Sequence, residues 1–260
     1  MSPTSASLLA PAIGYAGRLT AVASGKGGVG KTWFAITLAQ ALSRKGRKVL
    51  LFDGDLGLAN VDVQLGLNPQ YDLGAVLSGR VGFDQATVHH DAGGFDILPG
   101  RSGSGALAAL DGASLESVLE LLRGAASNWE EVVVDLGAGL EAPQRRMAAA
   151  ADTLLVVATD EPTSLTDAYA VLKLHLQDKP RGDVRIVINQ APDPAAGRTT
   201  YETLRRACLT FLKREVPLAG IVRRDDKVRD AIRRQMPLLT RHPNSVAAGD
   251  VEGIAWAYAG

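Results

Sequence analysis

The sequence of 260 residues has little cysteine, few aromatic residues and no excess of charge of either sign. Its one cysteine, Cys208, excludes an internal disulfide and any metal site built from several thiolates, which fits a reducing compartment. Lys and Arg number 28, as do Asp and Glu, so the net charge gives no reason to expect nucleic acid or an anionic membrane as a partner. No apolar run approaches the roughly 18 residues of a membrane-spanning helix, and we expect a soluble, cytoplasmic protein.

Aliphatic residues supply most of the hydrophobic content, which is 46% of the chain with only 5% aromatic residues. Short aliphatic runs separated by stretches with helical spacing predict alternating strands and helices. The runs are Leu19–Ala23, Val49–Phe52, Phe95–Leu98, Val132–Val134, Leu154–Val157 and Val184–Ile188. We therefore predict an α/β fold, a mostly parallel twisted sheet with helices on both faces and ligands at the carboxyl ends of the strands.

Helical spacing is clearest after Gly30, and Gly46 is predicted to end that helix. Further helices are predicted over Leu115–Leu122 and Ala168–Leu176, and a Gly/Ser-rich loop over Gly100–Gly105. Residues 1–17 are rich in Ser, Ala and Pro and lack the basic start of a signal peptide, so we interpret them as a flexible lead-in. No linker interrupts residues 18–260, which predicts a single domain.

A glycine-rich stretch follows the first predicted strand and opens a helix, which is the context expected of a phosphate-binding Walker A loop. It consists of Gly25, Lys26, Gly27, Gly28, Val29, Gly30, Lys31 and Thr32. The glycines let backbone N–H groups surround the phosphates, Lys31 is expected to reach the β and γ oxygens, and the Thr32 hydroxyl to ligate Mg²⁺.

The same stretch also fits the Gly-x-Gly-x-x-Gly fingerprint of dinucleotide-binding proteins, with Asp53 as the acid at the end of the next strand. An NAD-binding oxidoreductase is therefore an alternative. That fingerprint requires neither the adjacent Lys31 and Thr32 nor a second aspartate of the Mg²⁺-binding type, so the sequence favours ATP with Mg²⁺ as the ligands.

Three aspartates follow predicted strands on the expected ligand side of the sheet. Asp135 precedes a flexible glycine turn, where a carboxylate can hold Mg²⁺ through water; without the phosphate loop, a helix cap would be an equally good interpretation. Asp53 and Asp55 end the second strand. Hydrolysis needs an attacking water in line with the γ-phosphate, so we assign Asp55 to that water and Asp53 to support of the metal.

Lys26 makes the loop resemble the deviant Walker A motif of the MinD/ParA family, in which a second lysine reaches across a dimer. The resemblance implies an ATP-held homodimer with Lys26, Lys31 and Asp55 as catalytic residues. An Asn after the late strand recognises adenine in that family, and Asn189 matches it. The stretch from Asp53 to Leu67, with Ile97–Gly100 and then Ser102 and Gly103, resembles the FlhG/FleN branch, which regulates flagellar number and placement.

The resemblance implies a slow ATPase switch that acts on flagellar basal-body or regulatory proteins, such as an FlhF-type GTPase, the switch complex or a transcription regulator, and that is recruited to a cell pole through them. A ParA-like DNA partition ATPase and a MinD-like cell-division regulator are alternatives. Two departures stand out. Arg223 and Arg224 occupy positions where relatives often carry a proline near the base, and no Asp-Gln-Ala-x-x-Leu-Arg segment occurs near the N-terminus, which speaks against FlhF activation.

Several other features have ordinary structural interpretations. The basic late region is interleaved with acids, which favours i,i+4 ion pairs over DNA binding. Its basic residues are Arg205, Arg206, Lys213, Arg214, Arg223, Arg224, Lys227, Arg229, Arg233 and Arg234. Val246–Gly260 has no Lys or Arg, so membrane attachment is expected to be weak or indirect. We expect His89 and His90 in a surface loop and Trp33 in the core.

Overall fold

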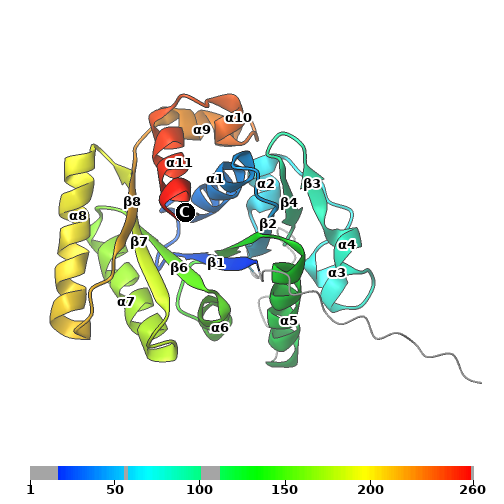
Figure 1. Cartoon of the computed structure of the whole chain (residues 1–260), viewed down its shortest axis with the longest axis horizontal. Coiled ribbons are helices and arrows are strands. Elements are labelled where there is room, and N and C mark those ends of the chain that lie inside the picture. The colour runs from blue at the N-terminus through cyan, green and yellow to red at the C-terminus, as the bar shows by residue number, and fades with distance from the viewer. Residues whose placement is uncertain (1–16, 56–57, 101–111, 259–260) are drawn as a thin grey trace, which may run out of the picture.

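The computed structural model describes residues 17–55, 58–100 and 112–258, which contain one eight-stranded sheet in the order β3-β4-β2-β5-β1-β6-β7-β8 (Figure 1). All neighbouring strands are parallel except β3 and β4. The strands are β1 Arg18–Ala23, β2 Val49–Gly54, β3 Val88–His90, β4 Phe95–Leu98, β5 Glu131–Leu136, β6 Thr153–Ala158, β7 Asp183–Ala191 and β8 Leu218–Arg223. The predicted α/β fold is confirmed.

Helices cover both faces of this sheet. Figure 1 shows α1 and α11 on one face and α5, α6 and α7 on the other. The helices are α1 Lys31–Arg44, α2 Val61–Leu65, α3 Leu73–Leu77, α4 Phe83–Ala86, α5 Gly112–Asn128, α6 Ala142–Ala150, α7 Pro162–Asp178, α8 Pro194–Ala207, α9 Asp226–Arg233, α10 Leu238–Arg241 and α11 Val246–Tyr258, with one π-helical turn, η1, over Cys208–Leu212.

Some sequence expectations fall outside the described residues. These are the lead-in up to residue 16, the loop beyond Gly100 with Ser102 and Gly103, and the pair Leu56 and Gly57 in the flagellar-type segment. That residues 18–260 form one domain stays a prediction. Within the described ranges, no helix is both long enough and apolar enough to cross a membrane.

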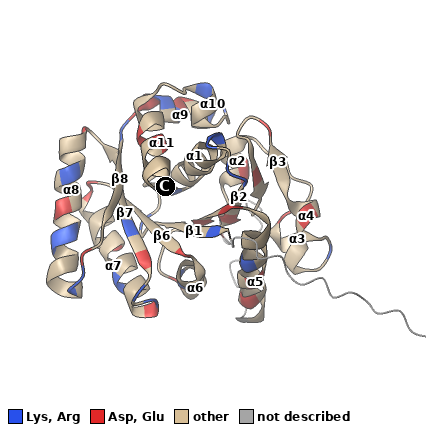
Figure 2. Cartoon of the chain, viewed as in Figure 1, with Lys and Arg blue, Asp and Glu red and all other residues tan. Residues whose placement is uncertain are grey.

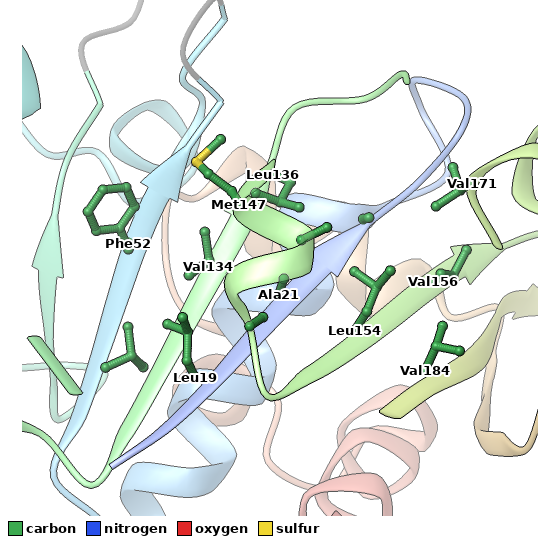
Figure 3. Packing of buried hydrophobic residues seen from close by; sticks show 14 of the residues in the cluster. Leu19, Ala21, Phe52, Val134, Leu136, Met147, Leu154, Val156, Val171 and Val184 are labelled. Atoms are coloured by element: carbon green, nitrogen blue, oxygen red, sulfur yellow. The ribbon is translucent and has the colours of Figure 1, made fainter. Parts of the chain in front are cut away.

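The core has two layers, one on each face of the sheet, because side chains alternate along every strand. On β1, Leu19 and Ala21 pack into the layer under α5, α6 and α7, whereas Val22 packs into the layer formed with α1 and α11. Figure 3 shows part of the first layer, where Met147 of α6 joins strand residues. Burial on both faces explains why the strands have nearly continuous apolar sequences.

The first helix follows its prediction closely. Gly46, with φ +82°, lies two residues beyond α1, a backbone conformation that favours glycine and ends the helix. Trp33 is 6% exposed and belongs to the core layer of α1, so its predicted packing is confirmed.

The predicted loop at His89 and His90 is wrong, and the predicted surface position is confirmed for His89 but not for His90. Both lie in β3, which pairs antiparallel with β4 through a turn closed by Gly93 and Gly94 N–H groups donating to the His90 carbonyl. His90 is buried with its ring stacked on Phe95 at 5.7 Å between centroids, and burial lowers its pKa. His89 is exposed and contacts Asp96 at 2.7 Å.

Of the ten basic residues named above for the late region, Arg205 and Arg223 form ion pairs with acids in the structure, and neither does so at i,i+4 spacing. Arg205 pairs with Glu202 at i,i+3 and with Glu215 beyond the helix. Asp230 of α9 pairs with Arg241 of α10 rather than within its own helix. Figure 2 shows basic and acidic segments interleaved along α8. The prediction of i,i+4 pairs is therefore corrected, because tertiary packing brings closer partners than the helix does.

Candidate functional site

The sheet places the sequence motifs at one edge. Strand β1 lies between β5 and β6, and the chain crosses to opposite sides of it, which makes the carboxyl end of β1 a topological switch point. The phosphate loop follows β1 there, and α1 begins at Lys31 with Gly30 as its N-cap residue. The first N–H groups of α1 therefore face the position expected for phosphate.

Gly28 and Gly30 have φ values of +82° and +88°, in the left-handed region that glycine enters without strain. Gly30 has a second constraint, because a Cβ there would lie 2.5 Å from the Asn189 amide nitrogen. That nitrogen donates to the Val29 carbonyl at 2.7 Å. The end of β7 thus ties down the phosphate loop.

Lys31 and Asp135 form a buried ion pair, with 2.5 Å between Nζ and Oδ1. Burial raises the pKa of Asp135, and the neighbouring Lys31 and Thr32 act against that shift. The second oxygen, Oδ2, is buried without a hydrogen-bond partner among the described residues. An unsatisfied carboxylate oxygen beside a threonine hydroxyl offers the oxygen ligands that Mg²⁺ prefers, so these residues fit the metal.

Asp53 lies directly across from Asp135 in the pairing of β2 with β5. Its two oxygens accept from the N–H groups of Asp55 and Val61, each at 3.2 Å, and it is 0% exposed. Burial and then Asp135 raise its pKa to about 8. This buried position next to Asp135 suits indirect support of a metal. The dinucleotide alternative needs an exposed carboxylate that can bind a ribose hydroxyl, and Asp53 does not provide one.

Asp55 follows the end of β2, where its Oδ1 accepts from the Leu58 N–H at 3.0 Å. It lies against the turn that follows β5, because a Cβ on Gly137 would be 3.1 Å from Oδ1. The same turn is tied to the phosphate loop, since the Gly139 N–H donates to the Ser24 carbonyl at 3.1 Å. An acid, the glycine turn after β5 and the phosphate loop therefore meet at one place.

Lys26 does not share the pocket of Lys31. Its Nζ lies 2.5 Å from Oε2 of Glu161 and 3.0 Å from Oγ1 of Thr163, at the start of α7. Gly25 is packed so closely on α7 that a Cβ would lie 2.4 Å from the Asp167 backbone. Sequence reasoning missed Glu161 and Thr163, although their place just after β6 is a signal that the strand-end rule could have used.

Asn189 is 3% exposed and lines a pocket of about 290 Å³ beside the phosphate loop. Trp33, Gln190 and Arg223 also line it. Gln190 has φ +58°, unusual for a residue other than glycine, and Arg223 is held by Asp250 at 2.7 Å. The pocket suits a nucleobase, and recognition of adenine by Asn189 stays a prediction.

Residues 20–238 match the model of the CobQ/CobB/MinD/ParA nucleotide binding domain. The chain is 36% identical over 238 residues to the antiactivator FleN of Pseudomonas aeruginosa, covering 92% of this chain and 85% of that protein. It is 30% identical over 239 residues to the flagellum site-determining protein YlxH of Helicobacter pylori, covering 92% and 80%. The resemblance to flagellar relatives is confirmed.

Solved structures agree with this assignment. The septum site-determining protein MinD of Pyrococcus horikoshii OT3, complexed with Mg-ADP, has a TM-score of 0.77 at 25% identity, covering 93% of this chain and 95% of that one. A chain of the MinC:MinD cell division protein complex of Aquifex aeolicus has a TM-score of 0.77 at 27% identity, with the same coverage. The chain therefore belongs to the CobQ/CobB/MinD/ParA family and is a P-loop ATPase that uses ATP and Mg²⁺.

Proposed function

We propose that this ATPase is a switch that dimerises on ATP and regulates the number or placement of flagella. The flagellar part is supported by the likeness to FleN and YlxH over 92% of the chain. The dimer part is supported by Lys26, which extends to α7 instead of its own phosphate site. Partners of this chain would then be flagellar basal-body or regulatory proteins, through which it reaches a cell pole.

Within one subunit, Lys31 binds the β and γ oxygens; Thr32 and Asp135 would hold Mg²⁺, which would supply positive charge next to the phosphates. When ATP binds, Lys31 leaves Asp135 and pairs with phosphate, and the Asp135 carboxylate would then be available to a metal ion. Both states keep the buried charges paired, which avoids the cost of an isolated charge.

Asp55 orients the water that attacks the γ-phosphorus. A bond forms between the water oxygen and phosphorus, the bond from phosphorus to the bridging oxygen of ADP breaks, and a water proton passes to the carboxylate or to the departing phosphate. Asp55 suits this role because it lies against Gly137, in the turn that is tied to the phosphate loop through Gly139.

Lys26 contacts the ATP of the other subunit. Its present ion pair with Glu161 is solvent-exposed, with 37% and 60% exposure of the two side chains. Such pairs contribute only ~0–1 kcal/mol, so a triphosphate can displace Glu161. Two copies related by a two-fold axis would exchange these lysines, and hydrolysis would release them.

Light scattering after gel filtration tests the switch directly. The wild-type chain should have a mass of 27.3 kDa with ADP and twice that mass with ATP. Asp55→Ala should stay dimeric with ATP because the water is not oriented, whereas Lys26→Ala should bind ATP and stay monomeric. Lys173→Ala, which removes an exposed lysine further along α7, is the matched control and should behave as wild type.

The two variants must fail in opposite directions for the proposal to stand. If both variants were monomeric in the presence of ATP, the switch would be refuted. The flagellar role is tested separately by deleting the gene and counting flagella per cell; an unchanged number and position would remove that role and leave the ATPase intact.

A further inference from the structure

Two polar side chains, those of Asp55 and Gln144, approach the turn after β5. Asp55 belongs to the sequence motifs described above, whereas Gln144 does not. β2 and β5 pair with Gly54 opposite Leu136, so Asp55 and Gly137 come next at the strand ends. A Cβ built on Gly137 would lie 3.1 Å from Oδ1 of Asp55 and 3.2 Å from Nε2 of Gln144. The carboxylate and the amide therefore approach one point from two different elements.

Gln144 reaches this point because of where α6 begins. It is the third residue of the helix, directly after the turn, whereas Met147 and Ala148 of the same helix are buried in the core. The helix is anchored to α7 through Arg145, whose Nε and Nη2 bind the two oxygens of Asp178 at 2.9 and 2.6 Å. This two-point contact fixes the direction in which the first turn of α6 presents its side chains.

The amide is not placed here for stability. Its Oε1 is buried and has no hydrogen-bond partner among the described residues. A buried, unsatisfied acceptor costs free energy, and an apolar side chain of the same length would avoid that cost. Local features that lower stability without a structural gain are concentrated at functional sites.

The chemistry of the site gives the amide a use. The carboxylate of Asp55 must hold its orientation while it binds the attacking water, and the N–H groups of a neighbouring amide can fix it. An amide stays neutral, so it adds no negative charge next to the γ-phosphate. Other P-loop enzymes use a glutamine to orient the attacking water.

We propose that Gln144 is a positioning residue for ATP hydrolysis, which acts through Asp55 by holding its carboxylate against Gly137. This inference rests on the proposed role of Asp55. Because α6 begins a few residues after the turn that follows Asp135, the position of that turn sets how closely Gln144 approaches Asp55.

Gln144→Met keeps the length of the side chain and removes the amide. We expect kcat to fall on the order of tenfold or more with an unchanged KM for ATP, a retained ATP dimer and an equal or higher Tm. Arg146→Gln, an exposed change on the same helix, is the control and should leave kcat unchanged. A merely structural role predicts the opposite pattern, a lower Tm with normal kcat.

Gln144→Glu adds a readout that folding defects do not produce. An ionised carboxylate repels Asp55, but a protonated one donates a hydrogen bond as the amide does, so its kcat relative to wild type should rise as the pH falls. A wild-type kcat in Gln144→Met, or a flat ratio for Gln144→Glu, overturns the inference. Asp55→Asn is measured in parallel: normal turnover there would refute the proposed role of Asp55 instead.

Discussion

Gly30 is the residue at which backbone conformation and close packing coincide. Its φ of +88° favours glycine, and a Cβ would also meet the Asn189 amide at 2.5 Å. Gly46, with φ +82° and nothing within 4 Å of an added Cβ, has only the first constraint. Alanine substitutions at these two glycines therefore separate the cost of backbone strain from the cost of losing the contact between β7 and the phosphate loop.

Gly46→Ala should lower the free energy of unfolding by ~1–2 kcal/mol through backbone strain alone. Gly30→Ala should lower it by a further ~1–3 kcal/mol, because the displaced Asn189 amide loses its bond to Val29 and stays buried. Urea denaturation of the nucleotide-free protein measures both. Equal decreases in the free energy of unfolding of the two variants would mean that the Asn189 side chain shifts at no cost in stability.

Residues that belong to a local sequence motif could be predicted. Residues that come together only through the fold could not. The phosphate loop and the strand-end aspartates Asp53, Asp55 and Asp135 are recognisable within a few positions of a strand. Glu161 follows β6 and Gln144 lies in α6; the strand-end rule points to Glu161 without pairing it with Lys26, and nothing in the sequence pairs Gln144 with Asp55. Only the strand order brings them together.

At the scale of elements, the central strands could be predicted and the edge strands could not. β1, β5 and β6 are covered on both faces, so their sequences are continuous apolar runs. β8 is mostly half-buried, and β3 has three residues with mixed burial. A short or partly covered strand needs fewer apolar residues, and its pattern does not stand out from that of a loop.

Helix α7 carries a buried group that should make its packing sensitive to acid. The pKa of His175 is lowered from 6.5 to about 4, mainly by burial; Lys179 and Arg214 contribute to the decrease, and Asp178 opposes it. Neither ring nitrogen has a hydrogen-bond partner among the described residues. Above pH 6.5 the residue is neutral in both states, whereas at lower pH the unfolded chain binds the proton more strongly.

The protein should therefore lose stability as the pH falls from 6.5 towards 4, with up to ~2 kcal/mol of the loss at pH 5 due to His175. His175→Phe should remove that part of the loss and leave the contributions of the carboxylates. Urea denaturation at pH 7.5 and pH 5 gives the difference for each protein. If the free energy of unfolding had the same pH dependence in both proteins, protonation of His175 would make no contribution to the loss of stability.

At the scale of the whole molecule, α7 connects Lys26 of the phosphate loop with α6. Its first turn holds Lys26 through Glu161 and Thr163, and its last turn holds α6 through Asp178. Release of Lys26 to the phosphate of a second copy would therefore change the contacts of the helix that anchors α6. Dimerisation and hydrolysis would then be coupled through α7.

The central claim is that Lys26 acts across the dimer, and mixing two inactive variants tests it most directly. Lys26→Ala retains Asp55, and Asp55→Ala retains Lys26, so a mixed dimer contains one complete site only if the lysine works in trans. ATPase activity is measured for each variant and for their equimolar mixture, at concentrations at which light scattering shows dimers. If Lys26 acts in trans, the activity of the mixture should exceed the mean of the two separate activities. An activity equal to that mean, with mixed dimers present, would contradict it.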